Sequence, residues 1–148
     1  GTAGLQGSPG LADVLTGSAY LGEALVKGSV EGLELLPAGR MPANPSELLG
    51  APMMRDLLRE LAADRLVIID APPVLRFTDG VVLAARAGGV ILVARAGRTS
   101  AEDLHEAALA IEQGGGRMLG VVLNNVSELG GKRKSLRSGV VSAESVPV

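Results

Sequence analysis

The amino-acid sequence predicts an α/β protein: a three-layer α/β/α arrangement with a mostly parallel sheet. Short apolar runs alternate along the chain with segments of helical periodicity, which is typical of strand–helix–strand units. The run Leu66–Ile69 leads into Asp70 and then into Pro72 and Pro73. Such a run indicates a strand covered on both faces, and the prolines forbid its continuation. Strands are therefore predicted near 33–37, 66–70, 90–95 and 118–124, all parallel.

Composition sets limits on the function. A length of 148 residues fits one domain, and 1% aromatic content predicts a core of Ala, Val, Leu and Ile. The absence of cysteine excludes disulfides and thiolate metal sites. A net charge of -2 indicates no nucleic-acid partner. The apolar runs are also too short to span a bilayer.

The first third of the chain predicts short helices. One is expected after Pro9, ended by Gly17, and a second is expected to be capped by Ser18. The strand at 33–37 follows and is closed by proline and glycine. A loop and a single helical turn lead to Pro52, which suits the first position of a longer helix. The apolar stripe of that helix consists of Met53, Met54, Leu57, Leu58 and Leu61.

The second half alternates helix and strand. Thr78 and Asp79 open a helix, and 90–94 is a second buried strand. Ser100 and Asp103 have the spacing of a capping box, so a helix is predicted from there to about Gln113. His105 lies beside its apolar stripe with leucine four residues on, so we interpret it as a surface or boundary residue and not a metal ligand. The third buried strand covers 118–123.

The domain prediction is a body of residues 1–126 and a tail of residues 127–148. The tail is rich in serine and glycine, with four positive charges against two negative ones. It is predicted to be a disordered basic segment. The chain begins with Gly1 and shows no signal peptide, so we expect a fragment or a gene product whose beginning is missing.

Candidate site residues follow from the sheet. In a parallel sheet the carboxyl ends of all strands share one edge, where ligands bind. The loops predicted there, 37–44, 70–79, 95–99 and 124–127, place a carboxylate, arginines and two asparagines together. Asp70 is the candidate catalytic residue and Mg²⁺ ligand. The candidate nucleotide-binding residues are Asp79, Arg95 for phosphate, and Asn124 and Asn125 for a purine edge.

Each candidate has a simpler interpretation. Asp70 would then only cap a turn before Pro72, and the asparagines would only end a strand. Arg95 would lie in a solvated loop. A phosphate-binding loop also needs Gly-x-x-x-x-Gly-Lys-Ser/Thr. The pair Gly131-Lys132 fails this test, because valine stands at the first glycine position and arginine at the hydroxyl position. That loop would have to lie before Gly1.

Several segments in order resemble one family. The sequence Asn-Pro-Ser-Glu-Leu-Leu at 44–49 is followed by Val-Ile-Ile-Asp-Ala-Pro-Pro-Val-Leu at 67–75 and by Thr78-Asp79. Val-Ala-Arg-Ala-Gly-Arg-Thr at 93–99 and Leu-Gly-Val-Val-Leu-Asn at 119–124 complete the set. Over about residues 9–126 the chain resembles the bacterial tyrosine autokinases (BY-kinases) of capsular and exopolysaccharide biosynthesis, within the P-loop NTPase superfamily.

The resemblance implies ATP-dependent tyrosine autophosphorylation that regulates polymer export and chain length, with ATP and Mg²⁺ as cofactors. It implies a cytoplasmic domain at the inner face of the bacterial plasma membrane. Its partner would be a membrane chain-length regulator, separate or fused upstream, and a homo-oligomeric ring is possible for the family. Asp70 matches the Walker B aspartate, and Asn124 matches the residue near adenine.

The chain departs from the family pattern in three ways. The Walker A and A′ motifs are absent from these 148 residues, Ala71 replaces the usual threonine, and the 127–148 segment holds no tyrosine. Three hypotheses follow: part of a tyrosine autokinase, a non-catalytic scaffold of the polysaccharide export machinery, or a partitioning-type ATPase. The sequence upstream of Gly1 would discriminate best among them.

Overall fold

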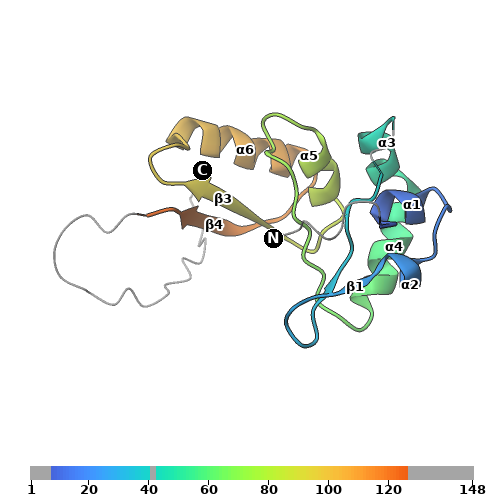
Figure 1. Ribbon diagram of the computed structural model, residues 1–148. Coiled ribbons are helices and arrows are strands. Elements are labelled where there is room, and N and C mark those ends of the chain that lie inside the picture. Colours follow the sequence, from blue (N-terminus) through green and yellow to red (C-terminus); the bar gives the residue numbers. More distant parts are fainter. Residues whose placement is uncertain (1–7, 41–42, 127–148) are drawn as a thin grey trace. The chain divides into compact units, whose positions relative to one another are not determined.

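The computed structural model describes residues 8–40 and 43–126, so the predicted tail lies outside the described residues. The chain divides into two compact units, residues 1–69 and 70–148. Figure 1 labels helices and strands of both units. No helix in the described ranges combines the length and the apolar character needed to cross a bilayer.

Among its described residues the first unit contains four helices, and the sequence predicted all of them. Gly17 has a φ of 74°, in the left-handed region, and stands just past the first helix as expected. The cap of the second helix is Tyr20 and not Ser18, because the Ser18 N–H donates to the Asp13 carbonyl and closes a turn instead. The four helices are α1 (Leu11–Leu15), α2 (Leu21–Ala24), α3 (Pro45–Gly50) and α4 (Pro52–Ala62).

Helix α4 carries much of the buried surface of this unit. Pro52 is its first residue, as predicted, and Met54, Leu57 and Leu61 are buried at helical spacing. Met53 was predicted to join this stripe but is 55% exposed. Successive residues of a helix differ by about 100° in direction, so Met53 turns away from the face that Met54 presents to the core.

Asp13 connects α1 to the loop after residue 36 through a hydrogen bond and an ion pair with Arg40. Its carboxylate is buried, accepts a hydrogen bond from the Gly10 N–H at 2.9 Å and lies 3.7 Å from Arg40 Nε. The Leu11 N–H donates to the Pro37 carbonyl at 2.7 Å beside it. This role of Asp13 was not predicted, because its partner Arg40 lies 27 residues away in the chain.

We expect Gly10→Ala to destabilise the protein by roughly 1–3 kcal/mol, the usual cost of forcing an extra carbon into a packed site. A β-carbon at Gly10 would overlap the backbone of Pro37 and Gly39, which cannot rotate away. The matched control is Gly22→Ala in α2, where a β-carbon meets nothing within 4 Å. Urea unfolding of both variants checks the prediction, and equal stability would contradict it.

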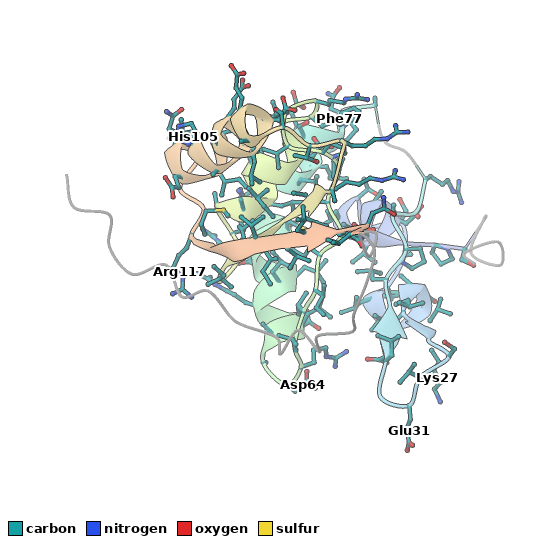
Figure 2. The ribbon with its side chains drawn as sticks, turned by 90° about the vertical axis from the view of Figure 1, so that its left-hand side faces the viewer. Lys27, Glu31, Asp64, Phe77, His105 and Arg117 are labelled. Atoms are coloured by element: carbon teal, nitrogen blue, oxygen red, sulfur yellow. The ribbon has the colours of Figure 1, made fainter. Side chains whose placement is uncertain are left out.

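The strand predicted at 33–37 is shorter than expected and belongs to a hairpin. Strands β1 (Val26–Lys27) and β2 (Glu34–Leu35) pair antiparallel, so the prediction that this strand joins a parallel sheet is wrong. The Gly28 N–H donates to the Leu33 carbonyl and so closes the base of the loop between the two strands. The glycines allow a tight return, and a local ladder forms with little loop-closure cost. Figure 2 shows Lys27 on this hairpin and Glu31 at its tip.

A side-chain hydrogen bond from Arg65 to Glu34 connects the hairpin to the chain just after α4. The Arg65 guanidinium donates to Glu34 at 2.6 Å and to Asp64 at 2.8 Å. The hydrogen bond from Arg65 lowers the pKa of the Asp64 carboxyl below its ordinary value. These side chains are solvent-exposed, so this contact orients the hairpin and adds little to stability.

The segment 66–70 is not a strand in this structure, which contradicts the prediction. Its side chains alternate between exposed and half-buried, and Leu66 and Ile68 are 87% and 85% exposed. The apolar run gives this segment a tendency to be extended, but a strand exists only with a hydrogen-bonded neighbour. Among the described residues, none pairs with it.

The second unit contains the parallel pair that the sequence predicted. Its elements are α5 (Asp79–Ala84), β3 (Val90–Arg95), α6 (Ala101–Gln113) and β4 (Met118–Asn124). Both strands have the predicted bounds and pair in parallel, with Val93 opposite Val122 and Arg95 opposite Asn124. The α/β class and the parallel pairing are confirmed.

Helix α6 connects the two strands and contributes Ala107 and Ile111 to the core of this unit. The predicted capping box is present: the Asp103 N–H donates to Ser100 Oγ at 3.0 Å, and the Ser100 N–H to Asp103 Oδ2 at 3.3 Å. Ala107 and Ile111 are buried, and Ile111 is fully covered. His105 is exposed, as predicted, on the outer side of the helix (Figure 2).

Both faces of the β3–β4 pair carry exposed apolar side chains. Helix α6 packs against β4 (Figure 1). Alternate side chains point to opposite faces of a sheet, and Val121, Val122 and Leu123 are all exposed, so the prediction that these strands are buried is wrong for part of both faces. The exposed apolar residues on the strands are Ile91, Val93, Leu119, Val121, Val122 and Leu123.

Candidate functional site

The carboxyl ends of β3 and β4 bring two of the predicted loops together. Arg95 and Asn124 are opposite partners in the strand register. The Ala96 N–H extends the ladder by donating to the Asn124 carbonyl at 2.9 Å. Arg95, Asn124 and Asn125 therefore share one edge of the pair, as the sequence predicted.

A tight turn fixes the backbone beyond Arg95. The Arg95 N–H donates a hydrogen bond to Thr99 Oγ1 at 2.9 Å, and the Thr99 N–H donates one to the Arg95 carbonyl at 2.9 Å. Gly97 has a φ of 71°, so the turn requires a residue that tolerates the left-handed region. The exposed Arg95 side chain thus projects from a backbone position that these two hydrogen bonds hold in place. No role was predicted for Thr99, although it lies four residues after Arg95, a spacing that allows this turn.

Asn124 and Asn125 end β4 with a local hydrogen bond. Asn125 has a φ of 57°, and its N–H donates to Asn124 Oδ1 at 2.7 Å. Asparagine tolerates this conformation better than most residues. The bond occupies the side-chain oxygen of Asn124 and leaves its NH₂ group to donate, for example to a ring nitrogen of a purine.

Asp70 is the first residue of the second unit and its side chain is exposed. In the described part of the chain, its carboxylate takes part in no hydrogen bond or ion pair with another side chain. Pro73 accepts hydrogen bonds from the Arg76 and Phe77 N–H groups, which closes a turn just after it. The expectation that Asp70 ends a buried parallel strand is wrong, since 66–70 forms no strand; its role in a site stays a prediction.

The other predicted positions divide between the two units. Asp79 is the first residue of α5, half-buried, in the same unit as Asp70. The 37–44 loop follows β2, a strand of the antiparallel hairpin in the first unit. The prediction that this loop lies at the edge of a shared parallel sheet is therefore wrong.

The carboxylate of Asp70 suits Mg²⁺ as a single protein ligand. The described residues include no group of three or more histidine, aspartate or glutamate side chains that could form a metal cage by themselves. Magnesium bound with a nucleotide needs only one or two carboxylates, because phosphate oxygens and water complete its shell. The exposed carboxylate of Asp70, which has no partner within residues 8–40 and 43–126, meets that requirement.

No protein-family model matches the chain. Among curated proteins, it is 35% identical over 124 residues to the tyrosine-protein kinase ptk of Acinetobacter johnsonii. It is 32% identical over 120 residues to the tyrosine-protein kinase CpsD of Streptococcus agalactiae. These matches cover 82% and 80% of this chain, but only 17% of the first relative and 52% of the second.

Solved structures give the same result. The kinase domain of Escherichia coli tyrosine kinase ETK matches with a TM-score of 0.77 and 35% identity, over 86% of this chain and 51% of that chain. The VpsO kinase domain matches with a TM-score of 0.75 and 33% identity, over 81% of this chain and 60% of that chain.

The similarity thus extends over most of this chain in sequence and in fold. It agrees with the resemblance that the Asp-Ala-Pro-Pro and Asn-Pro-Ser-Glu-Leu-Leu segments predicted. It reaches only about half of each matched kinase domain. The chain is a homologue of bacterial tyrosine-protein kinases and corresponds to part of their kinase domain.

Proposed function

We propose that this chain is part of an ATP-dependent protein-tyrosine autokinase that regulates exopolysaccharide or capsule polymerisation and export. The observation that carries the proposal is the 35% identity to ETK over 86% of this chain. The strand-end residues Arg95 and Asn124, held opposite each other, support it. The protein would act at the inner face of the bacterial plasma membrane, with a membrane chain-length regulator as its partner and with homo-oligomeric rings as its assembly.

Different residues of this chain would bind the metal, the phosphates and the adenine of Mg·ATP. Asp70 would hold Mg²⁺, which neutralises charge on the phosphate oxygens during phosphoryl transfer. Arg95 projects from its fixed turn and would contact phosphate, whereas the NH₂ group of Asn124 would donate to the adenine edge. Asn125 fixes the orientation of Asn124, and Asp79 is a second carboxylate for the nucleotide site.

The phosphate-binding loop is the component that these 148 residues do not contain. That loop and its lysine make most of the contacts to phosphate in this class of site. We therefore expect residues 1–148 alone not to bind Mg·ATP in the micromolar range, whereas the complete protein does. Titration calorimetry of both is the measurement.

The test of the function is tyrosine phosphorylation by the complete protein. We expect Mg·ATP-dependent transfer of labelled phosphate to tyrosine, abolished by chelation of the metal. A complete protein that binds its membrane partner but transfers no phosphate would overturn the kinase proposal and favour the scaffold.

A further inference from the structure

Tyr20 is the single tyrosine of the sequence and its side chain is 81% exposed. In the described ranges its hydroxyl takes part in no hydrogen bond. A tyrosine that stabilises its own fold is usually packed along the ring and bonded at the hydroxyl. Tyr20 does neither, so packing does not explain its presence.

The backbone on both sides of Tyr20 is held in place. On one side, the Ser18 and Ala19 N–H groups both donate to the Asp13 carbonyl, at 2.8 and 3.2 Å. On the other side, the Tyr20 N–H donates to the Glu23 carboxylate at 3.1 Å. Tyr20 itself is extended, with φ -83° and ψ 148°. The ring therefore projects into solvent from an extended residue between two anchored turns.

We propose that Tyr20 is a phosphate-acceptor site for the tyrosine kinase activity of this protein, an inference that rests on the proposed function. The phenolic oxygen of Tyr20 attacks the γ-phosphorus of ATP. The new oxygen–phosphorus bond forms as the bond from the γ-phosphorus to the bridging oxygen breaks. ADP leaves with that electron pair, and the phenolic proton passes to water.

The geometry meets the requirements of such an acceptor. Phosphoryl transfer depends on positioning, so the attacking oxygen must reach the γ-phosphorus of a nucleotide held by other residues. A side chain exposed along its whole length can enter another active site without unfolding its own unit. The 127–148 segment offers no alternative acceptor, because it contains no tyrosine.

The experiment uses the complete protein, incubated with Mg·ATP and digested with trypsin. Lys27 is the first basic residue of these 148, so Tyr20 lies in the peptide that ends there. We expect mass spectrometry to find phosphate on Tyr20 in the wild type. It should be absent in Tyr20→Phe, which removes only the hydroxyl and should fold as the wild type does.

A matched variant tests whether exposure alone is sufficient. Val30 is 64% exposed in the same unit, but it lies in the loop of the β1–β2 hairpin, whereas Tyr20 caps helix α2. In the background of Tyr20→Phe, we expect V30Y to receive less than about a tenth of the phosphate that Tyr20 receives. Equal labelling at position 30 would overturn the assignment of a specific site.

The remaining outcomes separate this inference from the proposed function. Phosphotyrosine elsewhere in the complete protein, with none on Tyr20, would overturn the inference and leave the kinase function standing. No phosphotyrosine anywhere, while ETK is active in the same assay, would overturn both.

Discussion

Replacing Asp70 by asparagine should lower Mg·ATP-dependent tyrosine phosphorylation by the complete protein by roughly 10²–10³-fold, the usual cost of removing one charge-stabilising group from an active site. Asparagine has the size of aspartate but lacks the negative charge that attracts Mg²⁺. The fold should survive, because the Asp70 side chain is exposed and, within the described residues, has no hydrogen-bond or ion-pair partner. Phosphorylation rates, with circular dichroism for folding, measure the two effects separately.

The control for this prediction is Asp56→Asn, the same chemical change on the exposed surface of α4. Among the described residues, Asp56 pairs with the exposed Arg55 and Arg59 alone, at 3.6 and 3.7 Å, and such pairs contribute little. Its activity should stay within about twofold of the wild type. If a folded Asp70→Asn variant were as active as this control, Asp70 would be a turn residue, and the main evidence for its metal role would be lost.

The largest effect on stability is expected for Ile111→Ala. Ile111 is fully buried on the inner face of α6, and its carbonyl accepts the Gly116 N–H at 2.8 Å just beyond the end of the helix. Truncation leaves a cavity and removes apolar contacts, which costs about 2–5 kcal/mol. Urea unfolding followed by circular dichroism gives the change in the free energy of unfolding.

Leu109→Ala on the same helix is the matched control, because Leu109 is 40% exposed. A partly exposed leucine loses less transfer free energy and leaves no closed cavity, so a loss below about 1 kcal/mol is expected. Equal losses in the two variants would show that α6 packs differently from the structure described above.

The features that sequence alone predicted depend on neighbours in the chain. The capping box of α6 needs only Ser100 and Asp103, three residues apart, and both of its hydrogen bonds are present. Strands β3 and β4 have the predicted bounds because β-branched runs end at turn-forming residues on both sides. The order of the Asn-Pro-Ser-Glu-Leu-Leu and Asp-Ala-Pro-Pro segments was sufficient to identify the family.

The features that only the tertiary structure decided depend on residues far apart. Leu66–Ile69 has the composition of a central strand, yet no described residue pairs with it. Glu34–Leu35 pairs with Val26–Lys27 in a local hairpin and not in a parallel sheet. An apolar run sets the tendency to be extended, but the ladder partner and the covering layer are set by the rest of the fold.

The candidate site was likewise predicted in part from the sequence and decided in part by the tertiary structure. The sequence determined that Arg95 and Asn124 each lie at the end of a strand, and the parallel register then placed them opposite each other. Only the structure showed that Thr99 fixes the backbone of Arg95, and that Asp13 fastens α1 to the loop holding Arg40. These contacts depend on turn geometry and on burial across 27 residues of chain, which no local pattern of residue types encodes.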